Sequence, residues 1–472
     1  MPEIHDLTAL EQGRAIARGE LSSVEITRHY LSRSERLDAE VGAFVRLLPE
    51  LALEGAAAAD SAISAGQRPP DQPLFGVVCP VKDLDLVAGV PTSFGNPALE
   101  VTLDVDSNVV TALREAGLVI TGKTSTPEIG LPCYTEPDRL PTARNPWDLD
   151  RSAAGSSGGA AAAVAAGLAP LAQGSDGGGS IRLPAAVCGL VGIKPSRGRV
   201  SSGPFSYGVG DLATSGPLAR TVADAAALLD VMSSHSGSGD PLHAPPSEGS
   251  FLAAATRAPG RLRIGCYTSP VVGHTEPSAD VRSAIDATVE LLTELGHEVV
   301  AIDPPFDRSA VALFEILWSA SAAGLDLPPH VESTLTPLTA HLRERGRSYH
   351  AGELAAALAQ IRVMARSAIL ATAEFDAVLS PTATDVAFPV GSMRNDADPA
   401  ADFEAQKQWA SYTAICNVTG QPAINVPLNW SREGLPVGVQ LAGRPYDESL
   451  IISLSAQLEE ARPWLKRHPS LW

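Results

Sequence analysis

Two clusters of serine and glycine lie close together in this 472-residue chain and have the composition of a reactive site. The first is residues 155–159 (GSSGG) and the second is residues 174–182 (GSDGGGSIR), with an alanine-rich helix predicted between them. Consecutive glycines beside a serine let backbone N–H groups converge, because no side chain blocks them, and such a nest holds an anion or a developing oxyanion. The pattern therefore predicts either a phosphate cradle or the oxyanion hole of a serine nucleophile.

A serine nucleophile needs a base, and the usual base is missing from the glycine-rich half of the chain. No histidine occurs between His29 and His235, so lysine is the remaining candidate. Lys82 follows residues 76–81, an apolar run predicted to be a buried strand, and burial lowers the pKa of an amine. A neutral Lys82 would act as a general base. The alternative interpretation is an ion pair between Lys82 and Asp83 or another carboxylate.

A third motif, at residues 117–124, matches the P-loop pattern GxxxxGK[ST]. In a P-loop the four variable residues form a loop after a strand, whereas here they are Leu-Val-Ile-Thr and are themselves strand-like. Pro127 then interrupts any following helix. The context argues against nucleotide binding at this motif.

The composition restricts the partners and the compartment. With 35 Lys and Arg against 54 Asp and Glu, the formal net charge is -19, so the surface repels nucleic acid and acidic membranes. The five cysteines show neither disulfide nor metal-ligand spacing, and the first twenty residues contain no apolar core of a secretory signal. The alanine-rich stretch at 160–172 is too short to span a bilayer. We expect a cytoplasmic protein with no nucleic acid or membrane partner, no metal and no cofactor.

The hydrophobic periodicity divides the chain into four segments that would position these groups. They are an N-terminal helical segment packing on the core (1–70), an α/β core of short buried strands and helices (71–235), a surface loop or linker (236–250), and the remainder of the α/β domain (251–472). The last segment contains a predicted βαβ unit at 262–302 and a mostly helical, variable region at about 305–370.

Taken together, these motifs resemble the amidase signature family of serine hydrolases. The resemblance is carried by residues 155–159 and 174–185, with Ser156 and Ser180 24 positions apart. It extends to residues 76–83, 119–128, 144–148, 192–195, 216–224 and 434–440, so that nearly the whole chain is covered and 305–370 is least recognisable. The resemblance implies an α/β fold, a single large domain with a central mixed β-sheet covered by helices on both faces.

Position by position, the resemblance implies that Ser180 is the nucleophile, Ser156 a bridging serine and Lys82 the terminal base. The proton would pass from Ser180 through Ser156 to Lys82. Attack on a carbonyl would release an amine and leave an acyl-enzyme, which water would then cleave. The resemblance further implies that the peptide between Gly155 and Ser156 is cis, a conformation that is rare outside proline.

The resemblance also implies an oxyanion hole formed by the backbone amides of Gly177, Gly178, Gly179 and Ser180. Three places depart from the family pattern, the first being a proline at Pro80 in place of its usual position at Val78. Gly178 stands where threonine or isoleucine is common, and Ala154 stands where a further glycine is usual. The side chains of all three implied catalytic residues, Lys82, Ser156 and Ser180, are present.

The implied function is hydrolysis of a small-molecule carboxamide, anilide, carbamate or small ester. The substrate-binding residues are expected in variable loops, at Gly130, Leu131, Pro132, Cys133 and Tyr207, and Trp318 is either a pocket wall or core. An alternative is the amidase-fold subunit of a glutamine-dependent complex that amidates charged tRNA, but residues 208–214 lack the Tyr-Gly-Leu and Ser-Leu-Asp-Gln elements expected in such a protein. For the oligomeric state, a homodimer is the expectation, because homodimers are the commonest soluble oligomers.

Overall fold

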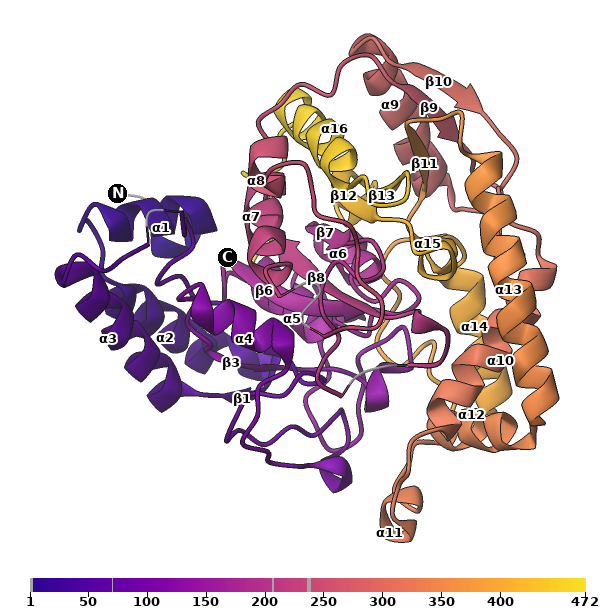
Figure 1. Cartoon of the computed structure of the whole chain (residues 1–472), viewed down its shortest axis with the longest axis horizontal. Coiled ribbons are helices and arrows are strands. Elements are labelled where there is room, and N and C mark those ends of the chain that lie inside the picture. The colour runs from indigo at the N-terminus through magenta and orange to yellow at the C-terminus, as the bar shows by residue number, and fades with distance from the viewer. Residues whose placement is uncertain (1–2, 70, 206–207, 236–238) are drawn as a thin grey trace.

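The computed structural model describes residues 3–69, 71–205, 208–235 and 239–472 and is built around one eight-stranded sheet (Figure 1). Its strand order is β10-β9-β11-β13-β12-β7-β8-β6. The strands are β6 (Leu171–Asp176), β7 (Val191–Lys194), β8 (Thr214–Ala219), β9 (Arg263–Cys266), β10 (Glu298–Ala301), β11 (Ala377–Pro381), β12 (Ala423–Trp430) and β13 (Pro436–Gly443). The pairs β10-β9 and β9-β11 are parallel and the other neighbours are antiparallel. The expected mixed sheet is confirmed.

Helices cover both faces of this sheet because successive residues of a strand point to opposite faces, and apolar residues lie on both faces here. In β6, Leu171 belongs to one hydrophobic cluster and Ala172 to another, and Ala219 and Leu218 of β8 divide in the same way. On one face lie α5 (Gly158–Ala165) and α6 (Arg182–Cys188); on the other lie α7 (Val222–Met232), α8 (Phe251–Ala254), α9 (Ala279–Glu294) and α16 (Glu448–Ala461). The α/β fold with helices on both faces is therefore confirmed.

Lys82 lies on a separate three-stranded sheet. Its order is β1 (Phe44–Leu47), β3 (Gly122–Thr124) and β2 (Val81–Lys82). The predicted strand at 76–81 is wrong in extent, because the ladder contains only Val81 and Lys82, with an isolated bridge from Val78 to Val119. Backbone hydrogen bonds still join residues 76–79 to residues 117–119, and Pro80, which has no N–H to donate to a ladder, separates this segment from β2.

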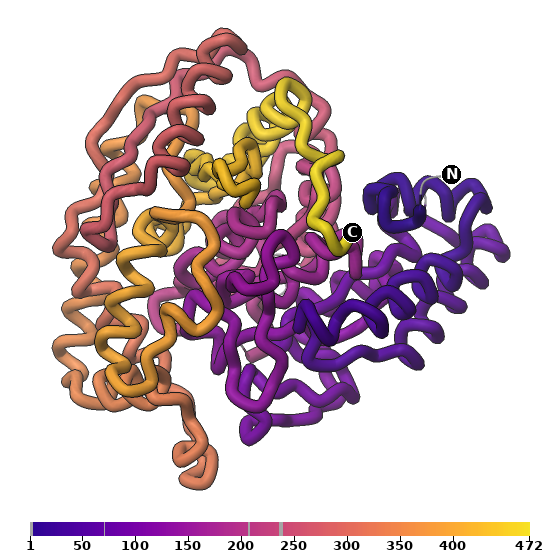
Figure 2. Tube along the Cα trace, turned by 180° about the vertical axis from the view of Figure 1, so that it is seen from behind, coloured from indigo at the N-terminus to yellow at the C-terminus, as the bar shows by residue number. Residues whose placement is uncertain are grey.

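The N-terminal helices lie on the same side of the molecule as this small sheet, and Figure 2 shows both chain termini there. The helices are η1 (Ile4–Asp6), α1 (Ala9–Ala17), α2 (Ser23–Val41), α3 (Pro49–Ser64) and α4 (Asn108–Glu115). Capping boxes at Thr8 and Ser22 fix the starts of α1 and α2. Short elements complete this half: η2 (Pro97–Leu99), η3 (Glu128–Gly130), β4 (Arg144–Asn145), β5 (Asp148–Ser152) and η4 (Val209–Asp211).

A group of helices forms the opposite side of the molecule (Figure 1). They are α10 (Ser309–Ala323), α11 (Pro329–Glu332), α12 (Pro337–Ser348), α13 (Ala351–Ala371), α14 (Pro399–Trp409) and α15 (Ala414–Thr419). Among the described residues, α13 is the one helix whose length and apolar composition would allow it to cross a membrane. It packs against α10 and α15, and a single helix of this kind is weak support for a membrane span.

Candidate active site

The amine of Lys82 lies in a cage of serine oxygens. The side chain is fully buried, and Nζ lies 2.7 Å from Ser156 Oγ, 2.9 Å from Ser157 Oγ and 3.1 Å from Ser175 Oγ. Burial lowers the pKa of Lys82 to about 7, and nearby carboxylates, Asp85 first among them, oppose this shift. Near neutral pH a large share of the amine is uncharged and able to accept a proton.

Another buried lysine, Lys123, pairs with Asp83, which is the carboxylate of the alternative interpretation of Lys82. Lys123 Nζ lies 2.9 Å from Asp83 Oδ1, and both side chains are buried. Lys123 Nζ also donates to the carbonyl of Asp85 at 2.7 Å and to Thr92 Oγ1 at 2.8 Å. The interpretation of Lys82 as half of an ion pair with Asp83 is therefore wrong, and the contacts of the Lys82 amine are with the serines.

Gln173 of β6 holds the strand that carries Lys82. Its Oε1 accepts the backbone N–H of Lys82 at 2.8 Å, and its Nε2 donates to Asp85 Oδ2 at 2.8 Å. Burial raises the pKa of Asp85, and the hydrogen bond from Gln173 and the charges of both lysines oppose this shift. A half-buried carboxylate is thus tied to the position of Lys82, and sequence reasoning did not single out either Gln173 or Asp85.

Ser156 reaches Lys82 from a loop whose backbone is tightly enclosed. The peptide between Gly155 and Ser156 is cis, as the resemblance implies. A Cβ atom built on Gly155 would lie 2.8 Å from the backbone of Tyr134, and one on Gly159 would lie 2.4 Å from the backbone of Ser125. Glycine is required at both positions because a neighbouring chain occupies the space of a side chain.

The second serine and glycine cluster is a turn between β6 and α6, and Asp176 holds its shape. The Asp176 carboxylate accepts the backbone N–H of Gly179 at 2.7 Å and of Ile181 at 3.1 Å, and it pairs with the fully buried Arg182. Burial raises the pKa of Asp176, but Arg182 outweighs burial and holds it far below the ordinary value. The backbone N–H of Ser157 donates to the carbonyl of Ser180 at 3.1 Å, which joins the two clusters.

The turn presents three unpaired amides. Among the described residues, the backbone N–H groups of Gly177, Gly178 and Ser180 have no hydrogen-bond partner, whereas that of Gly179 donates to Asp176. Gly179 has φ of 137°, and a Cβ atom there would lie 2.3 Å from Thr413 Oγ1. The geometry thus leaves three of the four amides implied by the resemblance available to an oxyanion.

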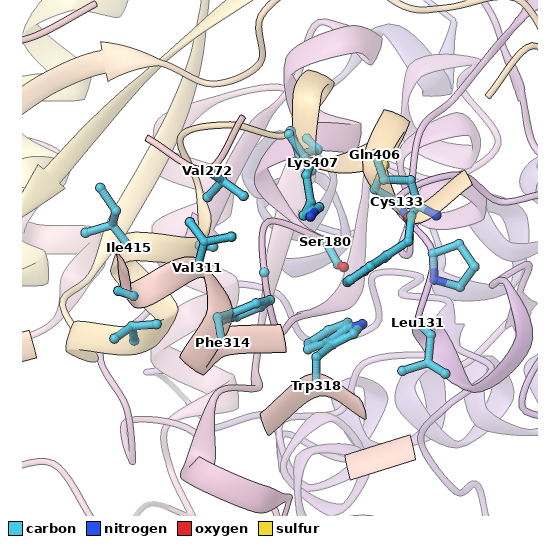
Figure 3. A pocket seen from close by; sticks show the side chains of 18 of the residues that line it. Leu131, Cys133, Ser180, Val272, Val311, Phe314, Trp318, Gln406, Lys407 and Ile415 are labelled. Atoms are coloured by element: carbon cyan, nitrogen blue, oxygen red, sulfur yellow. The ribbon is translucent and has the colours of Figure 1, made fainter. Parts of the chain in front are cut away.

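Ser180 opens into a cavity between segments that are distant in the chain (Figure 3). The lining is mostly apolar and consists of Leu131, Pro132, Cys133, Gly178, Ser180, Leu183, Val272, Phe306, Ala310, Val311, Phe314, Trp318, Phe403, Gln406, Lys407, Ala410, Ala414, Ile415 and Val418. The predicted Leu131, Pro132 and Cys133 lie here, and Trp318 is a wall of the cavity. Gly130 is outside the lining, where a Cβ atom would lie 3.4 Å from Ser156 Oγ. Tyr207 lies outside the described residues.

Sequence reasoning missed most of the wall formed by α10, α14 and α15. The spacing of Phe314 and Trp318 in α10 could have indicated this wall, because residues four apart lie on the same face of a helix. The charged member of the lining is Lys407, whose Nζ lies 2.5 Å from Glu315 Oε1 and 2.6 Å from Glu404 Oε2. Glu315 also pairs with Arg345, so these two cations and two carboxylates balance in formal charge.

Comparison with known proteins agrees with this fold and site. A family model described as Amidase matches residues 25–452. A Mycobacterium tuberculosis protein named "Putative amidase AmiB2" is 39% identical over 98% of each chain. A glutamyl-tRNA(Gln) amidotransferase component of Chloroflexus aggregans is 35% identical over 100% of this chain and 99% of its own. The solved structure of 6-aminohexanoate cyclic dimer hydrolase has a TM-score of 0.90 and 31% identity over 99% of each chain.

The fold and these relatives define a class, the α/β hydrolytic enzymes that cleave amide bonds. The family match covers most of the chain, and the similarity to full-length relatives extends over almost all of it. The chain belongs to the amidase signature family and is an amidase that acts on small-molecule amides.

Proposed function

We propose that this amidase works through an acyl-enzyme on Ser180, with Ser156 and Lys82 as its proton relay. The observation that supports this most directly is the 2.7 Å contact between Lys82 Nζ and Ser156 Oγ. Neutral Lys82 accepts the proton of Ser156 while Ser156 accepts the proton of Ser180. The Oγ of Ser180, which opens into the cavity, then attacks the substrate carbonyl carbon.

The unpaired amides of Gly177, Gly178 and Ser180 stabilise the charge that develops on the carbonyl oxygen. The tetrahedral intermediate collapses when the C–N bond breaks, and the amine leaves with the proton that Lys82 had accepted, returned through Ser156. Water then attacks the ester on Ser180 and gives one proton to the same relay. That proton returns to Ser180 as the ester bond breaks, so the products are a carboxylic acid and an amine.

The lining favours substrates whose groups beside the amide are apolar, since a buried polar group would lose hydrogen bonds with water without finding partners here. Carbamates and small esters present the same carbonyl to Ser180 and belong to the proposed range. The same argument places the transamidating alternative second, because the polar end of a glutamine would enter an apolar cavity. Glutaminase activity that depends on a partner protein would favour that alternative.

Covalent labelling tests the proposal. A fluorophosphonate should increase the protein mass by one phosphonyl group, and peptide mapping should locate that group on Ser180. Ser180→Ala should show neither labelling nor turnover of a chromogenic anilide. Ser156→Ala, which keeps the nucleophile, should be labelled much more slowly than the wild type. A folded Ser180→Ala protein that retains turnover would contradict the assignment.

A further inference from the structure

Two aromatic side chains of α10 approach the turn that carries Ser180 with the edges of their rings. The rings of Phe314 and Trp318 are stacked with centroids 5.4 Å apart and an interplanar angle of 18°. A Cβ atom built on Gly177 would lie 3.2 Å from the Trp318 ring, and one on Gly178 would lie 3.6 Å from the Phe314 ring. The rings therefore rest on the backbone of the turn itself, where any larger side chain would hold them away.

Gly178 connects this wall to the sequence. A Cβ atom at this position would already contact Phe314, and a threonine or isoleucine would add at least two heavy atoms beyond it. Glycine at 178 lets the ring approach the amides assigned to the oxyanion hole. Phe314 and Trp318 both line the cavity into which Ser180 opens, so their rings form part of its surface.

The opposite side of the cavity differs in character. Figure 3 shows Phe314 and Trp318 on one side of the Ser180 hydroxyl and Lys407 and Gln406 on the other. Lys407 and Arg345 together balance Glu315 and Glu404, so this group of side chains has no net formal charge. A neutral ring fits between the two sides better than an ionised group.

We propose that the cavity selects amides whose apolar group is a planar aromatic ring, stacked on Phe314 and Trp318. The proposal rests on the proposed function, because it places the reacting carbonyl at Ser180. Offset stacking adds to the burial of a ring, whereas a saturated ring of the same size gains burial alone. The expected preference for the flat ring is about three- to tenfold in kcat/KM.

Matched substrate pairs test this. Benzamide and cyclohexanecarboxamide differ in the flatness of the acyl group, and acetanilide and N-cyclohexylacetamide differ in that of the amine. Intrinsic reactivity differs within each pair, so the readout is the kcat/KM ratio of each pair in a variant divided by the same ratio in the wild type. That quotient cancels the chemistry of the substrate, and the pair that responds identifies the side of the amide that stacks.

We expect Phe314→Leu and Trp318→Leu to lower the ratio of at least one pair about three- to tenfold. Gly178→Thr should lower the same ratio, because its side chain displaces the Phe314 ring. Val311→Ala, a matched change in the same helix and cavity, should weaken both members of a pair alike. Unchanged ratios in all three test variants would overturn the proposal, as would labelling of Ser180 in an enzyme that hydrolyses neither aromatic amide. Failure of the proposed function is distinguishable, since Ser180 would then not be labelled at all.

Discussion

The acid limb of the pH–rate profile tests Lys82 as the base. If the neutral amine accepts the proton, kcat/KM falls as the pH drops below the pKa of Lys82, which burial lowers from 10.5 to about 7. We expect kcat/KM to level off above about pH 8 and to fall about tenfold per pH unit below about pH 6.

The depressed pKa also sets the size of the effect. At about pH 7.5, an amine with a pKa of about 7 is roughly three-quarters neutral, whereas an ordinary lysine is neutral in about one molecule in a thousand. Burial thus increases the reactive form several hundredfold. Lys82→Arg abolishes it, because a guanidinium keeps its proton, and the loss in kcat/KM should reach at least about a thousandfold. Lys82→Met, of similar length and uncharged, should lose as much.

The profile is measured from about pH 5 to 9.5 with a neutral amide, so that only groups of the enzyme titrate. Circular dichroism of both variants establishes that they are folded. An acid limb centred near pH 5 would refute the assignment, because the enzyme would then stay fully active near pH 6, where most of the Lys82 amine is already protonated. An arginine variant that keeps more than a tenth of the wild-type kcat/KM would refute it independently.

Three further changes test the surroundings of the site. Asp85→Asn keeps an acceptor for Gln173 but removes a charge that raises the pKa of Lys82, so the acid limb should move about one unit lower in a repeated profile, and no shift would contradict this role. Gly179→Ala places a Cβ 2.3 Å from Thr413 Oγ1 in a left-handed backbone region, and should lower kcat about a hundredfold or more in steady-state assays of folded protein. Burial raises the pKa of Glu459, which accepts the N–H of Val222, from 4.5 to about 8. The stability that protonated Glu459 contributes is fully present below about pH 4.5 and is lost as the pH rises through about 8. In urea denaturation, Glu459→Gln should therefore be more stable than wild type by about 2 to 4 kcal/mol at pH 9 and equally stable at pH 4.5. Equal stability of the two proteins at both pH values would contradict the shift.

The α/β fold was predictable because it follows from local patterns that the packing does not override. The predicted βαβ unit is the parallel pair β9 and β10 with α9 between them, and the predicted strand pair at 423–428 and 437–441 is β12 and β13. The predicted strand at 76–81 is wrong in extent because Pro80, which has no N–H to donate to a ladder, interrupts this apolar run. Burial, which is the property that matters for Lys82, was correctly expected.

The partners of Lys82 were less predictable than its burial. Two neighbouring carboxylates, Asp83 and Asp85, follow the lysine along the chain, and sequence proximity favoured the first as its ion pair. The choice is made by β3, which lies beside β2 and carries Lys123 to Asp83. An ion pair between parallel strands depends on register, and register is a tertiary property that no local pattern around Lys82 encodes.

The cavity was the least predictable part because its walls come from segments that are distant in the chain, around residues 131–133, in α10 and in α14 and α15. One position nevertheless links them. Gly178 could be read as a weakened turn when taken alone, yet a Cβ atom there would lie 3.6 Å from the Phe314 ring, so the ring limits any longer side chain. A glycine in the turn is therefore best interpreted with the residue that lies against it, and here that residue belongs to α10 and faces the substrate cavity.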